Sequence, residues 1–259
     1  MKNSFDHPFF FPLRPSSVNS SLNLFIFHYS GGTASQFRPW SNLLDSLIDP
    51  IGIQLPGREN RFGEPLFFEV KDVIQSLIEV FPKNMNTPFI VFGHSMGAAL
   101  AFEFVRALRE KNFNLPEHLI ISGRSAPHIP PRHKPIYHLR KEEFLEELIK
   151  YNGMSKEIIN SPELLDLFIP IVQADFSISD TYQYFQGSPL SCPITAFGGI
   201  NDFYVLEEDL RAWELHTESL FKYYMFEGDH FFLIKDSCLR VVDKINTIAS
   251  DVINNKKIS

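Results

Sequence analysis

The pentapeptide Gly-His-Ser-Met-Gly at residues 93–97 constrains the fold of this chain more than any other segment. It joins an apolar run at 88–92 to a segment of helical character at 98–106, which predicts a buried strand leading directly into a helix. A Gly-x-Ser-x-Gly pattern also occurs by chance in ordinary turns, but between a strand and a helix it is typical of a nucleophile elbow. The glycines let the helix approach the strand closely, because a side chain at either position would clash. We therefore predict that Ser95 is a nucleophile.

Short apolar strands alternate with helical stretches along most of the 259 residues. This alternation predicts an α/β fold with a mostly parallel sheet and helices on both faces. The length fits one large domain, or a domain that carries an insertion. Strands are expected at 22–28, 51–55, 88–92, 119–122, 193–197 and 221–226, and helices at 39–48, 70–81, 96–111, 142–151, 162–186 and 239–253.

The alternation is interrupted between residues 128 and 190. The first part, 128–139, is rich in proline, histidine and basic residues and has no strand pattern, and the two helices that follow lie between two strands of the sheet. We predict a core made of 1–127 and 191–259, with a helical lid, 128–190, inserted over the pocket. An ordinary helical crossover packed on the sheet is the alternative.

Composition excludes several classes of function. A net charge of −7 argues against a nucleic-acid partner, which usually selects a basic excess. The two cysteines, Cys192 and Cys238, provide neither a disulfide framework nor metal-ligand spacing, and they suit a reducing compartment. The N-terminus lacks the layout of a signal peptide, and no apolar stretch approaches the ~20 residues that span a bilayer. We expect a cytoplasmic protein with no metal and no membrane partner.

A serine hydroxyl becomes a nucleophile when a base accepts its proton and a carboxylate orients that base. In elbow proteins the chain order is serine, acid, histidine. His230 follows Glu-Gly-Asp just after the last expected strand, at the carboxyl edge of the sheet. His128, His133 and His138 lie in the lid segment, where we expect solvated or rim positions. We therefore predict His230 as the base.

The acid is expected at the end of another strand. The strand at 193–197 is followed by Gly-Gly-Ile-Asn-Asp, which places Asp202 on a tight loop beside the loop of His230. The strand at 119–122 is followed by Gly-Arg-Ser, which has no carboxylate. Asp229 is a weaker candidate, because neighbouring side chains usually point apart. We predict Asp202 as the acid.

The negative oxygen that forms on attack needs two backbone N–H donors. One is expected from Met96, directly after the nucleophile, and the other from the loop after the first strand. We choose the amide of Ser30, with Tyr29 as the alternative. Tyr29 and Gly31 are also expected to contact substrate, although the glycine pair in this loop equally suits a plain tight turn.

Further segments carry a family resemblance, and they are collinear from about residue 22 to residue 235. They are His28-Tyr29-Ser30-Gly31-Gly32, Gln54-Leu55-Pro56-Gly57-Arg58-Glu59-Asn60-Arg61-Phe62, the elbow, Ser122-Gly123-Arg124-Ser125-Ala126-Pro127, Ala174-Asp175-Phe176, Gly198-Gly199-Ile200-Asn201-Asp202, Trp213 and Gly228-Asp229-His230-Phe231-Phe232. In these segments the chain resembles the type II thioesterases, which are stand-alone α/β-hydrolases that work beside nonribosomal peptide and polyketide synthases.

The resemblance implies an α/β-hydrolase fold and a specific reaction. Such enzymes hydrolyse the thioester between an acyl group and the phosphopantetheine arm of a carrier protein. The resemblance implies Ser95, Asp202 and His230 as the triad, in agreement with the assignment from the residues. It implies no cofactor, because the arm arrives as part of the substrate. The chain departs from the family at Tyr29-Ser30, where small residues are common, and Tyr29 is expected to narrow the pocket mouth.

Three alternatives share this pattern. A thioesterase that releases medium-chain fatty acids from fatty acid synthase is the closest, a general carboxylesterase is the next, and a non-catalytic carrier-binding protein is the third. We expect a monomer whose partners are acyl or peptidyl carrier proteins. Arg58 and Arg61 are alternatively expected to hold their own loop in place. The candidates for a basic docking patch are Arg58, Arg61, Arg124, Arg132, Lys134 and Arg140.

Overall fold

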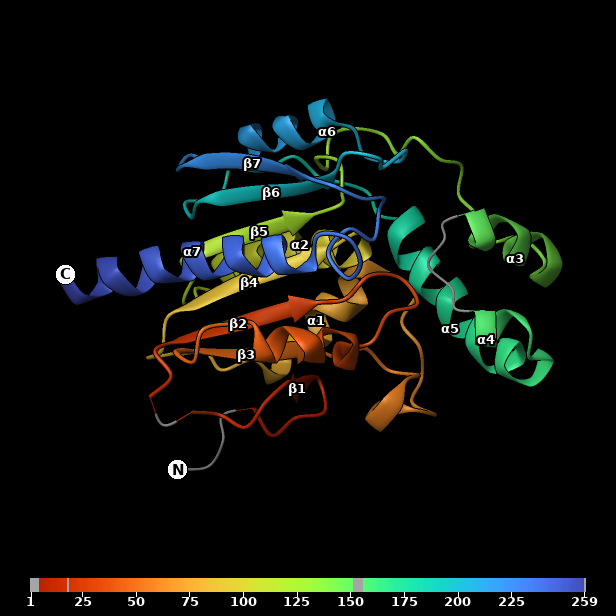
Figure 1. Ribbon diagram of the computed structural model, residues 1–259, viewed down its shortest axis with the longest axis horizontal. Coiled ribbons are helices and arrows are strands. Elements are labelled where there is room, and N and C mark those ends of the chain that lie inside the picture. Colours follow the sequence, from red (N-terminus) through yellow and green to blue (C-terminus); the bar gives the residue numbers. More distant parts are fainter. Residues whose placement is uncertain (1–4, 18, 151–155, 259) are drawn as a thin grey trace.

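Figure 1 shows the computed structural model of the chain, which describes residues 5–17, 19–150 and 156–258. In these residues seven strands form one sheet in the order β1-β3-β2-β4-β5-β6-β7. β1 runs antiparallel to β3, and the other neighbouring strands of the described sheet are parallel, as predicted. The strands are β1 (Phe10–Pro12), β2 (Leu22–Phe27), β3 (Ile48–Ile53), β4 (Phe89–His94), β5 (His118–Ser122), β6 (Ile194–Gly199) and β7 (Phe221–Phe226).

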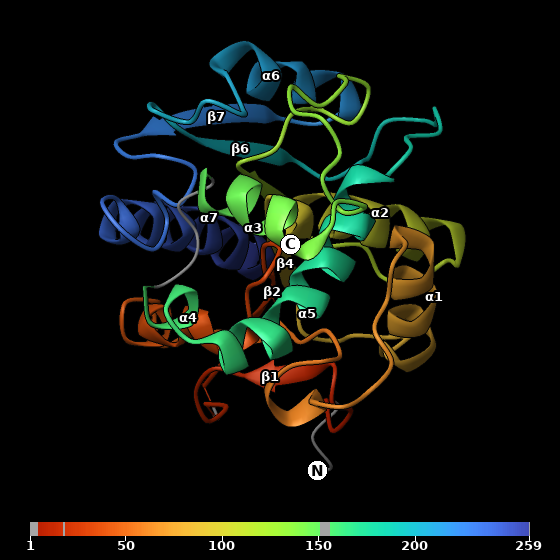
Figure 2. The same ribbon diagram turned by 90° about the vertical axis from the view of Figure 1, so that its right-hand side faces the viewer.

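Both faces of the sheet are covered by helices (Figure 2). Leu24 and Ile26 of β2 belong to one apolar cluster, and Phe25 and Phe27 belong to another. Side chains of a strand alternate between its two faces, so a strand buried on both faces is mostly apolar, and in β2 only Asn23 is polar. α1 (Val70–Val80) and α2 (Met96–Glu110) contribute to the cluster of Phe25, and α7 (Cys238–Ile258) contributes to the other cluster.

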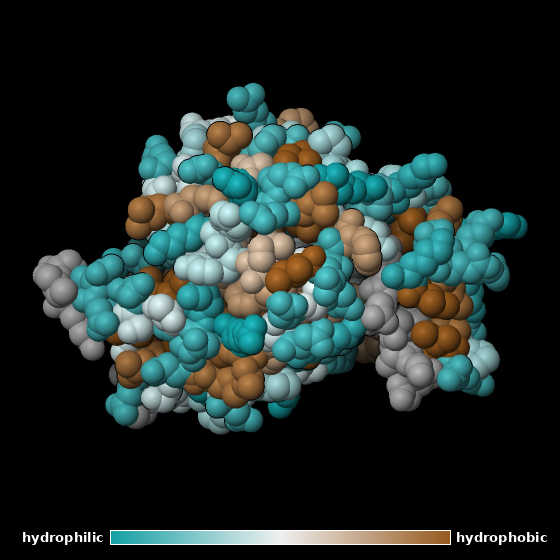
Figure 3. Space-filling view, turned by 45° about the horizontal axis from the view of Figure 1, so that its top comes forward, coloured by the Kyte–Doolittle hydropathy of each residue, from teal (hydrophilic) through white to brown (hydrophobic). Residues whose placement is uncertain are grey.

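Three helices lie beyond the carboxyl end of the sheet, in the segment predicted as a lid (Figure 1). They are α3 (Lys141–Lys150), α4 (Lys156–Ile159) and α5 (Pro162–Asp180), and they share an apolar cluster of their own. Figure 3 shows apolar side chains among hydrophilic ones at this end of the molecule. Leu164 and Leu167 of α5 are exposed there. That the segment acts as a lid stays a prediction, and so do the proposed domain boundaries.

The prediction of a helix at 39–48 was wrong. The chain forms a 3-10 helix, η1 (Ala34–Asn42), and then a loop that enters β3 at Ile48. The guanidinium of Arg14 explains the difference, because it donates to the carbonyl oxygens of Ser41 (2.7 Å), Leu44 (3.2 Å), Asp45 (2.6 Å) and Ile48. In an α-helix over 39–48 the carbonyls of Ser41 and Leu44 would accept hydrogen bonds from the N–H groups of residues 45 and 48 instead.

Several other elements begin or end at residues that differ from the predicted ones. β3 starts three residues before the expected strand at 51–55, and it includes Pro50, which lies just beyond Ile51, the last residue that pairs with β1. The ladder with β1 ends at this point, where the Pro50 carbonyl oxygen still accepts a hydrogen bond from the Leu13 N–H (3.0 Å), and prolines are tolerated at such strand edges. The helix expected at 162–186 ends at Asp180, and the last residue of the helix expected at 142–151 lies outside the described residues. The remaining helical elements are η2 (Glu59–Arg61), α6 (Glu207–Arg211) and η3 (Ala212–His216).

None of the helices in the described part of the chain is both long enough and apolar enough to cross a membrane.

Candidate active site

Ser95 lies on a strained turn between β4 and α2. Its φ of 55° and ψ of −115° are rarely adopted by a residue with a side chain. Its backbone N–H donates to the carbonyl oxygen of Ser122 on β5 (2.8 Å), which holds the turn against the neighbouring strand. A Cβ at Gly93 would lie 2.1 Å from the carbonyl oxygen of Gly97, and a Cβ at Gly97 would lie 2.3 Å from that of Phe27. Both glycines are therefore required by close backbone contact, as the elbow interpretation predicts.

Replacing Gly97 with alanine is expected to lower the free energy of unfolding by about 3 kcal/mol or more, because backbone atoms cannot move aside as a flexible side chain does. Denaturant unfolding measures this change. Gly187→Ala is the matched control, since its Cβ would meet the flexible end of Arg106 at 3.1 Å. Equal losses in the two variants would contradict the close approach of α2 to β2.

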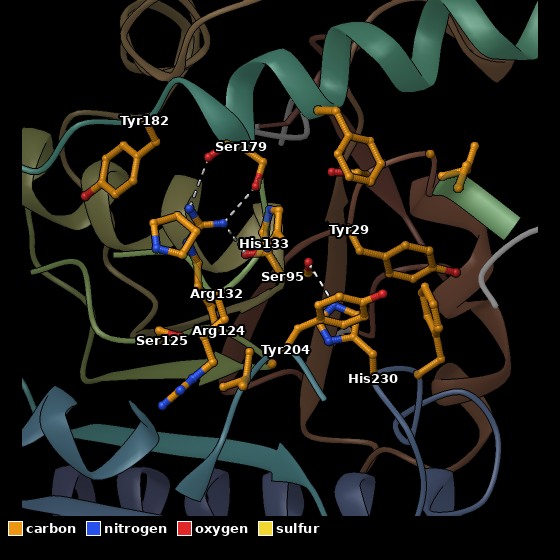
Figure 4. A pocket seen from close by; sticks show the side chains of 18 of the residues that line it. Tyr29, Ser95, Arg124, Ser125, Arg132, His133, Ser179, Tyr182, Tyr204 and His230 are labelled. Atoms are coloured by element: carbon orange, nitrogen blue, oxygen red, sulfur yellow. Dashed lines mark hydrogen bonds between the residues drawn. The ribbon is translucent and has the colours of Figure 1, made fainter. Parts of the chain in front are cut away.

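The structure brings the three predicted residues into one hydrogen-bonded chain. His230 Nε2 lies 3.0 Å from Ser95 Oγ, and His230 Nδ1 lies 2.7 Å from Asp202 Oδ2. Figure 4 shows Ser95 and His230 facing each other at the pocket. The Asp202 side chain is fully buried, and its Oδ1 accepts hydrogen bonds from the backbone N–H groups of Tyr204 (2.9 Å) and Val205 (3.3 Å). The carboxylate is thereby fixed in the orientation that meets the imidazole.

Two adjacent loops bring Asp202 and His230 together. They follow the neighbouring parallel strands β6 and β7, and the Asn201 N–H donates to the Gly228 carbonyl oxygen across them (3.0 Å). The rival carboxylate of Asp229 instead accepts a hydrogen bond from the backbone N–H of Phe231 (2.7 Å). The geometry therefore favours Asp202 as the partner of the histidine.

His94 is a buried neighbour of His230 that sequence analysis did not single out. The two ring centres lie 5.0 Å apart, and His94 Nδ1 lies 2.9 Å from Ser122 Oγ. Burial, and then the charge of a protonated His230, hold the pKa of His94 well below its usual range. His94 is therefore neutral near pH 7 and does not oppose a positive charge on His230. The position of His94, directly before the serine in the sequence, could have drawn attention to it. Its contact with His230 could not be foreseen from the sequence.

The loop after β2 forms a turn at residues 29–32. The Gly32 N–H donates to the Tyr29 carbonyl oxygen (2.9 Å), and Gly31 has a φ of +73° whereas Ser30 does not have a positive φ. This combination defines a type II turn, which needs glycine at its third position. The Gly31 N–H is already bonded to Asp175 Oδ2 (2.7 Å). Within the described ranges the N–H groups of Ser30 and Met96, the two predicted oxyanion donors, have no hydrogen-bond acceptor.

A cavity of about 120 Å³ opens beside Ser95 (Figure 4). Tyr29 and Gly31 line it, in the positions predicted to contact substrate. α5 supplies an apolar wall, and the loop after β5 supplies Arg124, whose guanidinium donates to Ser179 Oγ on α5 (3.0 Å). The wall residues on α5 are Phe168, Val172 and Phe176.

Residues 22–249 match the thioesterase domain family. The chain belongs to this family. It is 42% identical to the protein named linear gramicidin dehydrogenase LgrE of Brevibacillus parabrevis, over 84% of each chain. It is 41% identical to gramicidin S biosynthesis protein GrsT of Aneurinibacillus migulanus, over 84% of this chain and 86% of that protein.

Solved structures agree with this assignment. ClbQ from the colibactin NRPS/PKS pathway superposes with a TM-score of 0.84 at 29% identity, over 90% of this chain and 98% of that one. The type II thioesterase BorB from the borrelidin cluster superposes with a TM-score of 0.81 at 30% identity, over 91% and 96%. The predicted α/β-hydrolase fold is confirmed, and family membership makes the chain a thioester hydrolase.

In this thioesterase most of the basic residues proposed for docking form hydrogen bonds or ion pairs with other residues of the chain. Arg58 and Arg61 are buried, and they bond to Asp175 and to the Gln54 carbonyl oxygen, which favours the alternative that they hold their loop. Arg124 lies in the cavity. Arg132 and Arg140 form ion pairs with Asp209 and Glu143, and Lys134 is exposed.

Proposed function

We propose that this thioesterase removes acyl groups from the phosphopantetheine arms of carrier proteins in a nonribosomal peptide or polyketide synthase, and so restores arms that carry the wrong acyl group. The observation that carries the proposal is the chain of hydrogen bonds from Ser95 through His230 to Asp202, beside a cavity that Ser95 and His230 both line. The names of the relatives support the setting, because GrsT is a gramicidin S biosynthesis protein and BorB is a type II thioesterase.

The first half of the proposed reaction transfers the acyl group to the enzyme. Ser95 Oγ attacks the thioester carbonyl carbon while His230 Nε2 accepts the serine proton. The carbonyl oxygen becomes negatively charged and is held by the N–H groups of Ser30 and Met96. The carbon–sulfur bond then breaks, and the pantetheine sulfur leaves as a thiol with the proton from His230.

The second half releases the acid. His230 Nε2 accepts a proton from a water molecule, whose oxygen attacks the carbonyl carbon of the Ser95 ester. The same two N–H groups hold the oxygen, and collapse of the intermediate returns the proton to Ser95 Oγ. Asp202 keeps the imidazole in the tautomer that presents Nε2 to the serine. The proposed reaction uses only these groups and water, and phosphopantetheine enters with the substrate.

The medium-chain fatty acyl thioesterase is the second candidate. The rat S-acyl fatty acid synthase thioesterase, medium chain, is 30% identical to this chain over 83% of its residues. The relatives favour the first candidate, because the gramicidin S biosynthesis protein GrsT is 41% identical to this chain and the rat enzyme only 30%.

A dehydrogenase activity, which the name of LgrE gives to that protein, has no support in this sequence. Dinucleotide-binding turns of the Gly-x-Gly-x-x-Gly type need two glycines separated by one residue. The sequence has no such pair.

The test is thiol release from carrier proteins loaded with acetyl, butyryl or decanoyl groups, with the matching acyl-coenzyme A and p-nitrophenyl esters in parallel. We expect carrier-bound acyl groups to be hydrolysed with a higher kcat/KM than the matching coenzyme A thioesters and p-nitrophenyl esters. Preference for decanoyl-carrier would favour the medium-chain candidate, and preference for the simple ester would indicate a carboxylesterase. No turnover at all would revive the carrier-binding alternative. The monomeric state and the cytoplasmic location stay predictions.

A further inference from the structure

A buried ion pair joins α5 to the loop after β3. Both carboxylate oxygens of Asp175 accept hydrogen bonds from the guanidinium of Arg58, each at 2.7 Å. The side chains are 2% and 6% exposed. The proposed reaction does not use either residue. A buried ion pair is weak evidence for a role in stability, because the cost of removing both charges from water offsets their attraction.

The ion pair also contacts the turn at residues 29–32 from two sides. Asp175 Oδ2 accepts the hydrogen bond from the Gly31 N–H (2.7 Å), and Arg58 Nη1 donates to the Gly32 carbonyl oxygen (2.9 Å). α5 packs directly on the same turn, because a Cβ at Gly31 would lie 3.2 Å from Val172. We call Arg58 and Asp175, with these two bonds, the turn clamp.

The turn clamp selects one of two orientations of a peptide group. Type I and type II turns differ by a reversal of their central peptide, which here joins Ser30 to Gly31. In the structure the N–H of this peptide points at Asp175. After a reversal the Ser30 carbonyl oxygen would face the carboxylate, and two acceptors would oppose each other. The carboxylate therefore holds the turn in its type II form. The Ser30 N–H belongs to the preceding peptide group, whose Tyr29 carbonyl oxygen accepts the hydrogen bond from the Gly32 N–H across the turn (2.9 Å). Because the turn clamp anchors Gly31 and Gly32, it fixes this peptide and with it the direction of the Ser30 N–H.

We propose that Asp175 and Arg58 are positioning residues, which align the Ser30 N–H with the developing oxyanion and make this alignment depend on the docking of α5. The inference rests on the proposed function, because it assigns the Ser30 N–H to the oxyanion. An oxyanion donor contributes in the transition state and little to the binding of the ground state. Loss of the turn clamp should therefore lower kcat and leave KM nearly unchanged.

The test compares two inhibitors in the full-length Asp175→Asn variant. An acyl trifluoromethyl ketone adds Ser95 Oγ to its carbonyl carbon and so reproduces the oxyanion, with the serine proton on His230. A thioether analogue of the acyl-pantetheine reproduces only the ground state. We expect kcat and the affinity for the ketone both to fall by about 10- to 100-fold. The affinity for the thioether should stay within about twofold of the wild type.

Asp180→Asn is the matched control, because Asp180 is another buried carboxylate on α5 that accepts a backbone N–H, that of Ile136 (2.8 Å). It does not contact the turn, so its ketone affinity should stay close to the wild type even if its melting temperature falls. Equal losses of ketone affinity in the Asp175 and Asp180 variants would overturn the proposal, as would a parallel loss of ketone and thioether affinity at Asp175.

Arg58→Lys is the second test variant, to be used if Asp175→Asn does not fold. A lysine keeps the charge but cannot bond to both carboxylate oxygens and the Gly32 carbonyl in one planar fork, so we expect a smaller loss in the same direction. Unchanged ketone affinity in this variant would contradict the proposal. Wild-type thiol release is measured separately and tests only the proposed function. The ketone assay still tests the turn clamp if thioesters prove to be poor substrates.

Discussion

Replacing Ser95 with alanine is expected to lower kcat for thioester hydrolysis by about 10⁴-fold or more. In the proposed mechanism the Oγ atom forms the acyl ester. Without it, a water molecule activated by His230 would have to attack the thioester directly, which is a slower reaction. The assay is thiol release from a butyryl-loaded carrier protein, with single-turnover mass spectrometry to detect the acyl-enzyme. We expect no acyl adduct on the variant.

The fold should survive this change. The backbone N–H of Ser95, not its side chain, bonds to Ser122, and alanine meets the same backbone strain as serine. The melting temperature of Ser95→Ala should therefore lie close to that of Ser250→Ala, a change at an exposed position on α7. Full turnover by Ser95→Ala, with the fold intact, would refute the triad assignment.

The candidate catalytic residues could be located from the sequence because they lie at the ends of parallel strands. A parallel sheet brings the carboxyl ends of its strands to one edge, so loops far apart in the chain meet there. Ser95 follows β4, Asp202 follows β6 and His230 follows β7. The apolar pattern of each strand, together with the residue type after it, was enough to place all three side chains.

The contacts of charged side chains with distant backbone could not be predicted. Arg14 bonds to four carbonyls at residues 41–48, and two of them, those of Ser41 and Leu44, are ones that the expected helix would use. Arg58 and Asp175 are 117 residues apart and belong to separate elements. Their pairing leaves no periodic pattern in either segment. The resemblance marked both segments, but only the structure shows that they meet at the turn.

α5 contributes to two functions at once. Phe168 and Val172 line the cavity beside Ser95, which is proposed to hold the acyl group, and Asp175, on the same helix, bonds to the turn that carries the Ser30 N–H. A displacement of α5 would therefore change the shape of the cavity and the direction of the oxyanion donor together. In the proposed mechanism this couples the fit of the acyl group to the rate of its hydrolysis.

Replacing Asp202 with asparagine is expected to lower kcat by about 10³- to 10⁴-fold with little change in KM. The amide oxygen of the asparagine must face the N–H groups of Tyr204 and Val205, because these are donors. The amide nitrogen then donates to His230 Nδ1, where the carboxylate had accepted. The imidazole must shift its proton to Nε2, and in that tautomer it cannot accept the proton of Ser95.

Asp229→Asn is the matched control for this variant. Asp229 precedes His230 directly, but its carboxylate accepts from the Phe231 N–H, which an amide oxygen also does. We expect kcat within a few-fold of the wild type. NMR of the ring nitrogens would show the change of tautomer in Asp202→Asn and its absence in Asp229→Asn. If the losses of kcat were reversed between the two variants, Asp229 would be the acid, and the hydrogen bond that Asp202 accepts from His230 would not be needed for catalysis.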